Sequence, residues 1–373
     1  MSSPFDVAVV GAGAAGASCA AHLALRGLRV VVLEAGPFPR PKPCGGGMAA
    51  SVQRLFPFDL SPAVDQVIRR VRFSWCLEDP VIAELPGEAP FWIVQRAKLD
   101  AFLIEQATVA GAELRRDWPV TELQRQGDLW QLQGVAGTLQ SRGVVIANGS
   151  SSTLAAPLGL GSARPRYATT VAVDVEATVS EPDTARFEFG LVHHGFGWSF
   201  PRQGGYSIGL GTFIGREPAD ADAVLRRLLP DLGLPSDAGI RRTSALRTWD
   251  GHHRLHADGV VVVGDAASLC DPFLAEGIRP ALMSGTLAAE ALQQWLGGDE
   301  GALARYSQRM RQDWGESMAW GRRIAQVFYR VPKIGYQLGI KRPTAPQRIA
   351  QILSGQMGYG DIAQRVIKRL LFN

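Results

Sequence analysis

A glycine-rich turn near the N-terminus has the spacing of a dinucleotide-binding site. Its GxGxxG motif lies between an apolar run, 5–10, and a segment of small residues with helical character, 12–26. The first glycine of such a turn permits a tight bend, the second lets the backbone approach a pyrophosphate, and the third lets helix and strand pack closely. The positive end of the helix dipole then faces the phosphates. The residues expected to form this turn are Gly11, Ala12, Gly13, Ala14, Ala15 and Gly16.

A carboxylate follows the next apolar run. Residues 28–33 predict a second parallel strand, which ends at Glu34 and Ala35. A carboxylate in this position accepts hydrogen bonds from ribose hydroxyls. The combination of strand, turn, helix and acid argues against an ordinary glycine-rich turn, but it does not distinguish FAD from NAD.

A second motif, in the C-terminal half of the chain, favours FAD. The apolar run 259–263 ends in Gly264 and Asp265, which predicts a buried strand with a carboxylate facing a ribityl hydroxyl. After Pro272, a helix begins at Gly277, and its N-terminus would face the pyrimidine side of a flavin. Partial positive charge there stabilises the reduced, anionic flavin. The alternative is a strand and turn of a plain Rossmann domain, for which a second glycine-led helix start at this spacing is unusual.

Sequence motifs around these glycines resemble a known flavoprotein family. Together with Arg96 before the segment LDAFL, the two glycine motifs resemble the para-hydroxybenzoate-hydroxylase-type fold. The segment KPCGGG, 42–47, looks like the KPCGG loop of the geranylgeranyl reductase family. The segment FGWSFP, 196–201, resembles that family's YxWxFP motif, with Phe in place of Tyr. The segment DPFLAEGI, 271–278, is similar to its DPxxGEGI, with Ala275 in place of the first Gly.

The resemblance covers about residues 5–300 and agrees with the strand and helix patterns of the chain. Both indicate an α/β fold, α+β overall, with an FAD-binding Rossmann-like domain, an inserted antiparallel-sheet substrate domain and a helical C-terminal part. The expected ranges are 1–70, 96–165 and 255–300 for the FAD-binding domain, 71–95 and 166–254 for the substrate domain, and 301–373 for the helical, basic C-terminal part.

The resemblance implies an FAD-dependent oxidoreductase that reduces C=C bonds of a prenyl (geranylgeranyl) chain by hydride transfer from reduced flavin. It assigns further residues to the cofactor, namely Cys44, Gly45, Gly46, Arg96, Val120 and Ile278. The alternatives are an FAD-dependent monooxygenase or halogenase acting on an apolar or aromatic substrate, and a flavin-binding or membrane-scaffold protein without enzymatic activity.

An alternating aromatic segment is the candidate substrate wall. Phe196, Trp198 and Phe200 would point to one face of a strand, and Pro201 belongs to the same motif. A prenyl chain needs such an apolar wall because each buried CH₂ contributes about 0.8 kcal/mol. The alternative is that these aromatic residues belong to the ordinary hydrophobic core of a sheet. Cys44, in its glycine-flanked loop, is the candidate proton donor or gate, and its alternative role is that of a small apolar loop residue.

The chain offers no second GxGxxG after a strand, so a resident NAD(P) site is not indicated. We expect the electrons to come from transiently bound NADPH or from reduced ferredoxin. The four cysteines are widely spaced, and no metal-ligand pattern is present. This spacing predicts a reduced, cytosol-like compartment and no metal site.

Charge is distributed unevenly along the chain. The net charge of +4 is too small to argue for nucleic acid. Basic residues gather in the last fifty or so positions, where Asp361 is the sole acid after residue 320; they are Arg322, Arg323, Arg330, Lys333, Lys341, Arg342, Arg348, Arg365, Lys368 and Arg369. Interleaved with apolar residues, they suit an anionic membrane surface, although such charges often form only a solvated face. We therefore expect a cytoplasmic protein, peripheral on a membrane, that acts on a prenylated small molecule or lipid; the oligomeric state is not predicted.

Overall fold

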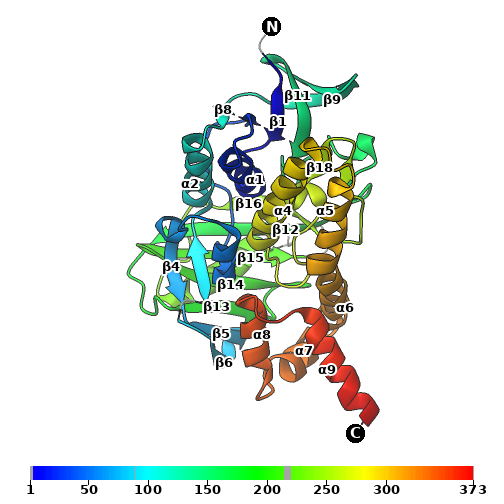
Figure 1. The fold of residues 1–373 in the computed structure, drawn as a ribbon. Helices are drawn as coiled ribbons and strands as arrows, with labels where there is room; N and C mark the ends of the chain where they lie inside the picture. The colour runs from blue at the N-terminus through cyan, green and yellow to red at the C-terminus, as the bar shows by residue number, and fades with distance from the viewer. Residues whose placement is uncertain (1–2, 89, 214–219, 373) are drawn as a thin grey trace.

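The computed structural model describes residues 3–88, 90–213 and 220–372, with side chains described as far as residue 365. Two large sheets and a set of C-terminal helices form the molecule (Figure 1). The N-terminal sheet and its helices lie at one end, the second sheet crosses the middle, and helices α7 and α9 lie at the other end. This arrangement confirms the predicted mixed α/β fold.

The first sheet has eight strands in the order β17-β18-β11-β1-β2-β8, with β10 and β9 added beside β11. Its strands are β1 (Phe5–Val10), β2 (Val30–Leu33), β8 (Glu113–Arg115), β9 (Val120–Gln126), β10 (Leu129–Gly134), β11 (Gly137–Ile146), β17 (His256–Ala257) and β18 (Val260–Val262). β18, β11, β1, β2 and β8 pair in parallel. The Val-rich runs of β1, β2 and β18 are buried, as expected for parallel strands covered on both faces.

Three helices accompany this sheet. They are α1 (Ala14–Leu25), α2 (Arg96–Val109) and α4 (Ile278–Leu296). α1 packs against both α4 and α2. The small residues of α1 permit this close packing, since almost all of the helix is buried. Arg96, which precedes the segment LDAFL, is the first residue of α2.

The second sheet has seven strands in the order β16-β12-β15-β14-β13-β5-β6. Its strands are β5 (Arg70–Trp75), β6 (Glu78–Glu84), β12 (Arg166–Glu176), β13 (Thr184–Phe189), β14 (Gly195–Arg202), β15 (Gly205–Thr212) and β16 (Arg242–Thr248). Neighbours pair antiparallel, except that β13 runs parallel to β5. Helix α3 (Ala221–Leu228) packs on β15, where Leu225 and Ile208 belong to one apolar cluster.

A small third sheet joins segments that are far apart in the sequence. It contains β3 (Gly47–Ala49), β4 (Val64–Ile68) and β7 (Phe91–Val94), with β7 in the middle. Gly47 pairs with Ile93, so the end of the KPCGGG segment is anchored to a strand. The division into an FAD-binding and a substrate domain stays a prediction, and this sheet joins strands from both sides of it.

The C-terminal part is helical, with α5 (Ala302–Met310), a π-helical turn η6 (Arg311–Gly315), α6 (Glu316–Arg330), α7 (Pro332–Gly339), α8 (Ala345–Leu353) and α9 (Tyr359–Phe372). Aromatic side chains of the C-terminal helices form hydrogen bonds with residues 262–273. The hydrogen bonds are Tyr306 Oη to Val262 O, Trp314 Nε1 to Leu269 O, Tyr329 Oη to Phe273 O and Tyr359 Oη to Asp271 Oδ2. Among the described residues, no helix is both long and apolar enough to cross a membrane.

Candidate active site

A cavity of about 540 Å³ is lined by residues of both large sheets. Its volume is in the range of small-molecule and cofactor sites. Most of the residues predicted for the site line it. They are Gly11, Gly13, Ala14, Ala15, Glu34, Ala35, Cys44, Gly45, Gly46, Arg96, Val120, Phe196, Trp198, Phe200, Asp265, Gly277 and Ile278. The two glycine motifs, the KPCGGG loop and the aromatic strand therefore meet at one place.

Five predicted residues do not line the cavity. Ala12, assigned to the cofactor, uses its N–H to bind Glu34 Oε2 at 2.7 Å. Gly16 packs against the carbonyl of Gly11, so its contribution is the close contact of helix and strand. Gly264 lies against Ala15, which leaves Asp265 as the residue of that pair at the cavity.

The other two are prolines. Pro272 is buried in the loop before α4, but the cavity begins only at Leu274. Pro201 follows Phe200 in β14, and successive side chains of a strand point to opposite faces. Pro201 therefore faces away from the wall that Phe196, Trp198 and Phe200 form, and its assignment to the substrate stays a prediction.

The glycine turn presents an uncapped helix N-terminus to the cavity. α1 follows Gly13 without a side-chain cap and without an acid in its first turn, so its first N–H groups are free for an anion. Arg96 lies beside this turn, because a Cβ atom at position 13 would be 3.7 Å from Arg96 Nη2. Asp100 holds the guanidinium through two bonds, of 3.1 and 2.8 Å. The arrangement can bind a pyrophosphate.

Glu34 lies at the next point along the cavity. Its side chain is 6% exposed, and its two oxygens accept N–H bonds from Ala12 and Gly36 at 2.7 and 3.3 Å. A carboxylate has about four acceptor sites, so two backbone bonds leave room for ribose hydroxyls. The sequence prediction for Glu34 is compatible with this geometry.

A second helix N-terminus opens on the same cavity. α4 begins after Gly277 without a side-chain cap, and Asp265 lies beside it. Lys42 Nζ contacts Asp265 Oδ2 at 3.2 Å. Lys42 thus joins the loop of residues 42–47 to the turn that follows β18. The sequence motif contains Lys42, but its role depends on a partner that only the fold supplies.

The KPCGGG loop lies directly against the aromatic wall. A Cβ atom at position 45 would be 2.9 Å from Phe200 Cε2 and 3.1 Å from Trp198 Nε1, so only glycine fits without a shift. Cys44 is half-buried here, and its Sγ accepts the N–H of Gly46 at 3.3 Å. Cys44 therefore lines the cavity next to the wall, and its role as gate or proton donor stays a prediction.

The wall is larger than the motif that predicts it. Phe187 of β13 packs on Phe196 and Phe200, with ring centroids 5.8 and 5.1 Å apart. Phe213 extends it from Phe196 to Tyr329 of α6, at 5.7 and 5.3 Å. Phe187 and Phe213 lie in segments whose strand pattern is visible in the sequence, but nothing there indicates which face they share with β14.

Three buried polar atoms at the cavity have no hydrogen-bond partner among the described residues. They are Asn148 Oδ1, just after β11, Trp198 Nε1 and Glu276 Oε1. Buried polar atoms are normally satisfied, so the first two indicate a missing polar ligand. Together with the two uncapped helix N-termini, they fit a long cofactor with a pyrophosphate at one end and a polar ring at the other. The residues present thus fit FAD.

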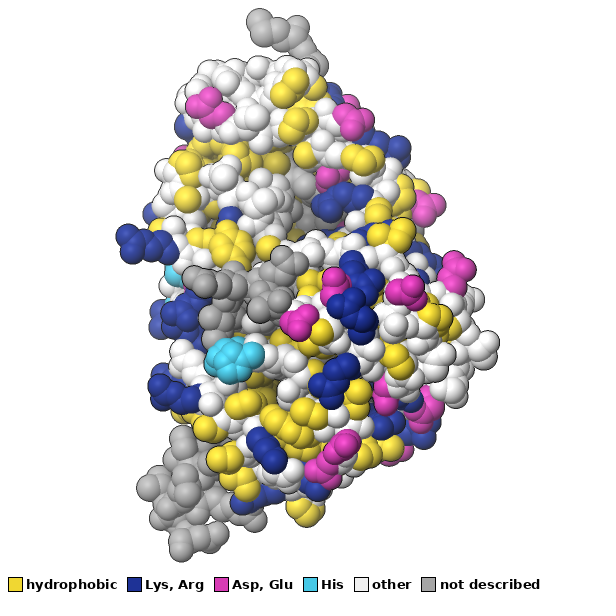
Figure 2. All heavy atoms as spheres, turned by 180° about the vertical axis from the view of Figure 1, so that it is seen from behind, with side chains coloured by type: hydrophobic (Ala, Val, Ile, Leu, Met, Phe, Trp, Pro, Cys, Tyr) yellow, Lys and Arg dark blue, Asp and Glu magenta, His cyan; other side chains and the backbone are white. Residues whose placement is uncertain are grey.

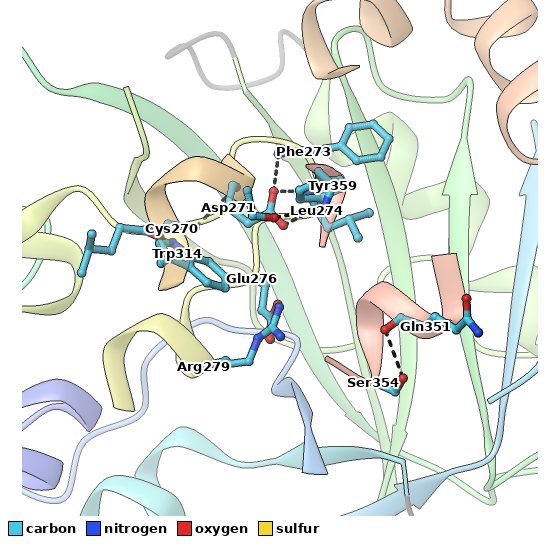
Figure 3. Close-up of polar contacts among 12 residues, drawn as sticks. Cys270, Asp271, Phe273, Leu274, Glu276, Arg279, Trp314, Gln351, Ser354 and Tyr359 are labelled. Atoms are coloured by element: carbon cyan, nitrogen blue, oxygen red, sulfur yellow. Dashed lines mark hydrogen bonds and ion pairs between the residues drawn. The ribbon is translucent and has the colours of Figure 1, made fainter. Parts of the chain in front are cut away.

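A buried acid near α4 also lines the cavity. Glu276 binds Arg279 through Oε2 at 2.6 Å (Figure 3). Its neighbour Asp271 accepts the N–H groups of Phe273 and Leu274 and the hydroxyl of Tyr359. Burial raises the pKa of both carboxyl groups above their ordinary values, although their hydrogen-bonding and charged partners oppose the rise. Within the part of the chain that is described, no group of three His, Cys, Asp or Glu residues could hold a metal ion.

Comparison with known proteins agrees with this site. The model of a family described as FAD dependent oxidoreductase matches residues 6–51 and 88–295. Digeranylgeranylglycerophospholipid reductase 2 of Methanothermobacter thermautotrophicus is 30% identical over 343 residues, which cover 84% of this chain and 85% of the relative.

Two solved structures share the fold. A geranylgeranyl bacteriochlorophyll reductase-like protein from Thermoplasma acidophilum aligns with a TM-score of 0.79 at 20% identity, over 95% of this chain and 93% of its own. A flavin-dependent brominase aligns with a TM-score of 0.74 at 19% identity, over all of both chains. Reductase-like and halogenating proteins therefore share this architecture, so the fold alone does not select the reaction.

Proposed function

The chain belongs to the FAD-dependent oxidoreductase family, as a member of its geranylgeranyl reductase type, and we propose that it reduces C=C bonds of a prenyl chain. The observation that supports this reaction best is the continuous aromatic wall, from Phe200 through Phe196 to Phe213, which faces the glycine loop in the same cavity as the FAD-binding turns. The similarity to a digeranylgeranylglycerophospholipid reductase supports a prenylated lipid or small molecule as the substrate.

Different residues along the cavity would bind different parts of FAD and the prenyl chain. The turn at Gly11 and Gly13, with Arg96, would hold the pyrophosphate of FAD, and Glu34 its ribose. Asp265 and the N-terminus of α4 would hold the flavin end. FAD supplies a hydride when reduced. The aromatic wall would exclude water and align the prenyl chain, each buried CH₂ contributing about 0.8 kcal/mol.

Cys44 lies between the cofactor-binding loop and the wall, where it would act as proton donor or gate. The electrons would come from NADPH that binds transiently or from reduced ferredoxin, since the sequence has one GxGxxG motif of the required setting. Both donors are tested directly by mixing each with the oxidised, FAD-loaded protein and recording the loss of flavin absorbance.

We also propose that the protein binds an anionic membrane through exposed apolar side chains on α6, on α7 and at the turn between them. The membrane stripe consists of Val327, Val331, Ile334 and Leu338, which are 68, 43, 57 and 54% exposed. They follow one another at intervals of three or four residues across the turn at Val331. Large exposed apolar side chains that gather on a soluble surface are typical of an interaction site.

Basic residues next to the membrane stripe favour anionic lipid as its partner. Arg323, Arg330, Lys333 and Arg342 are exposed, and Figure 2 shows Lys and Arg side chains along the edge formed by the C-terminal helices. Each basic residue near an anionic surface contributes about 1 kcal/mol. The inner side of α6 carries Tyr329, which packs on Phe213 of the wall. One helix thus contacts the cavity wall with one side and solvent with the other. The side chains of Lys368 and Arg369 lie outside the described residues.

The reaction is tested by anaerobic reoxidation. The FAD-loaded protein is reduced with dithionite and mixed without oxygen with geranylgeranyl diphosphate or a geranylgeranylated glycerolipid. Rapid return of oxidised flavin absorbance supports the proposal. Reoxidation only by oxygen, accelerated by an aromatic substrate with or without halide, would instead identify a monooxygenase or halogenase. Reoxidation by neither would favour a flavin-binding protein without enzymatic activity.

A further inference from the structure

Glu276 is a buried acid, and only one of its two carboxylate oxygens has a side-chain partner. Its side chain is 7% exposed, and Oε2 is held by Arg279 Nη2 at 2.6 Å. Oε1 is buried and has no hydrogen-bond partner among the described residues. Because a buried oxygen without a partner is costly, Oε1 at the wall of a cavity indicates a group that interacts with the contents of the cavity.

The other acids of the cavity are already engaged. The lining contains three acidic residues, Glu34, Asp265 and Glu276. Glu34 accepts two backbone N–H bonds at the ribose end, and Asp265 is paired with Lys42. Glu276 is the one with a buried, unpartnered oxygen. Among the acids of the cavity, a proton donor is therefore best sought at Glu276.

The loop around Glu276 is held in a strained conformation. Ala275 has φ +56°, a left-handed conformation that is unusual for a residue with a Cβ atom. Asp271 donates its N–H to the carbonyl of Glu276 at 3.0 Å and closes the loop. Such strain persists only when the surrounding structure maintains it, and it is typical of functional sites.

Arg279 keeps the orientation of the carboxyl group fixed from the other side. Its guanidinium lies over the ring of Trp314, 5.0 Å from the centroid. The turn at Gly355 also packs against it, since a Cβ atom there would be 2.9 Å from Arg279 Nη1. Arg279 and Glu276 therefore form one rigid unit between α4 and the C-terminal helices (Figure 3).

We propose, on the basis of the proposed function, that Glu276 is the acid that protonates the prenyl double bond. The proton leaves the Glu276 carboxyl and bonds to one alkene carbon, while the other carbon receives a hydride from reduced flavin. The π bond is lost, two C–H bonds form, the flavin is oxidised by two electrons, and Glu276 becomes a carboxylate that water reprotonates. In this arrangement Cys44 is left with the role of gate.

The charged and titratable groups that face Glu276 determine its pH response. Burial and Asp271 favour the neutral form, whereas Arg279, in the first turn of α4, and the backbone N–H of Ala49 favour the ionised form. Tyr359 approaches from α9 and interacts with the same group. The net effect is a raised pKa, so the acid stays protonated to a higher pH than an ordinary glutamic acid.

Glu276→Gln tests the proposal through a pH profile. The amide keeps the shape and can still accept from Arg279, but it cannot donate a carboxyl proton. We expect anaerobic reoxidation by a geranylgeranyl compound to fall at least about 100-fold, the usual share of general acid catalysis. Reoxidation by the wild-type protein should slow as pH rises, and this dependence should vanish in the variant. FAD content and reduction by dithionite should not change.

Two further variants complete the kinetic test. Glu290→Gln, at a partly exposed acid of α4 that does not line the cavity, should match the wild-type protein. Cys44→Ser should retain the pH dependence even if its rate changes. A Glu276→Gln variant within about twofold of wild type, or one that keeps the pH dependence, would overturn the proposal while leaving prenyl reduction intact.

Infrared spectroscopy gives a readout that needs no turnover. A protonated carboxyl group has a carbonyl band that a carboxylate lacks, and the band assigned by subtracting the Glu276→Gln spectrum should disappear as pH is raised. An ionised Glu276 across the working pH range would refute its role as acid. If the wild-type protein reduces no prenyl compound at all, the proposed function fails, and the role of Glu276 fails with it. If the wild-type protein reduces the compound and Glu276→Gln does so equally well, only the role of Glu276 fails.

Discussion

Lys42 Nζ lies 3.2 Å from Asp265 Oδ2, and the two residues are 223 positions apart in the sequence. The pair joins the KPCGGG loop to the turn after β18, at the flavin end of the cavity. Both side chains are largely buried, at 21 and 10% exposure, so the contact is less screened than a surface ion pair. The loop beside the aromatic wall is thus positioned by the same carboxylate that would bind the cofactor.

Replacement of Asp265 by alanine should weaken FAD binding. A hydrogen bond to a charged group contributes about 1.5–3 kcal/mol, so the dissociation constant should rise at least about tenfold. The measurement is flavin bound per protein during titration of the apoprotein. Asp258→Ala, at an exposed acid paired with Arg125, is the control and should bind FAD normally. Equal affinity in the two variants would show that Asp265 does not contact FAD.

Ala275→Gly should stabilise the protein. Position 275 has φ +56°, which glycine adopts without the Cβ clash, and the gain should be about 0.5–1 kcal/mol after the larger entropy of the unfolded glycine is counted. Ala304→Gly, exposed in the first turn of α5, should instead lose up to about 1 kcal/mol. The urea concentration at the unfolding midpoint should be higher than that of the wild-type protein for Ala275→Gly and lower for Ala304→Gly. A lower midpoint in both variants would contradict the strain at Ala275.

Long local patterns predict much of this fold. Continuous Val-rich runs indicate buried parallel strands, and β1, β2 and β18 confirm this. The GxGxxG spacing predicts a helix after the first strand, and α1 begins at Ala14, two residues after the expected start. The replacement of a family glycine by Ala275 is visible in the sequence, but the left-handed backbone at this position is a property of the structure.

Pairings between distant segments could not be predicted in this way. The parallel contact of β13 with β5 joins residues 184–189 to 70–75, and neither pattern specifies its partner. Lys42 and Glu276 both lie inside recognised motifs, yet their roles depend on Asp265 and Arg279, which the fold brings to them. Pro201 illustrates the converse, since it belongs to a motif but does not line the cavity with the aromatic residues of the same strand.

Charge on the membrane stripe should abolish binding to lipid. The double variant Ile334→Asp and Leu338→Asp removes exposed apolar surface and introduces repulsion from anionic headgroups, so partition into vesicles of phosphatidylglycerol should fall at least about tenfold. Sedimentation with vesicles at low salt measures it. The control is Val135→Asp with Ile240→Asp, two exposed apolar residues elsewhere. An equal loss of vesicle binding in both double variants would contradict the membrane stripe as the binding surface. Binding of the wild-type protein to neutral vesicles only would contradict it too.

Stability should depend on pH through the two buried acids. Because the folded-state pKa values of Asp271 and Glu276 are raised by burial, their contribution is full below the pKa of the unfolded groups and is lost as pH rises through the folded pKa. The stability advantage of the wild-type protein over Glu276→Gln should therefore shrink as pH rises above the ordinary pKa of a glutamic acid. Urea unfolding at saturating FAD checks this, and a difference independent of pH would mean that Glu276 has an ordinary pKa.

The central claim is the reduction of a prenyl double bond, and mass spectrometry of the product tests it most directly. The FAD-loaded protein is reduced and incubated without oxygen with a geranylgeranyl compound. The prenyl compound is then recovered, and its molecular mass is compared with that of the starting material. The account predicts a gain of two hydrogen atoms for each double bond reduced, lost when FAD is omitted. An unchanged prenyl chain, or a product that gains oxygen or halogen once air is admitted, would contradict it.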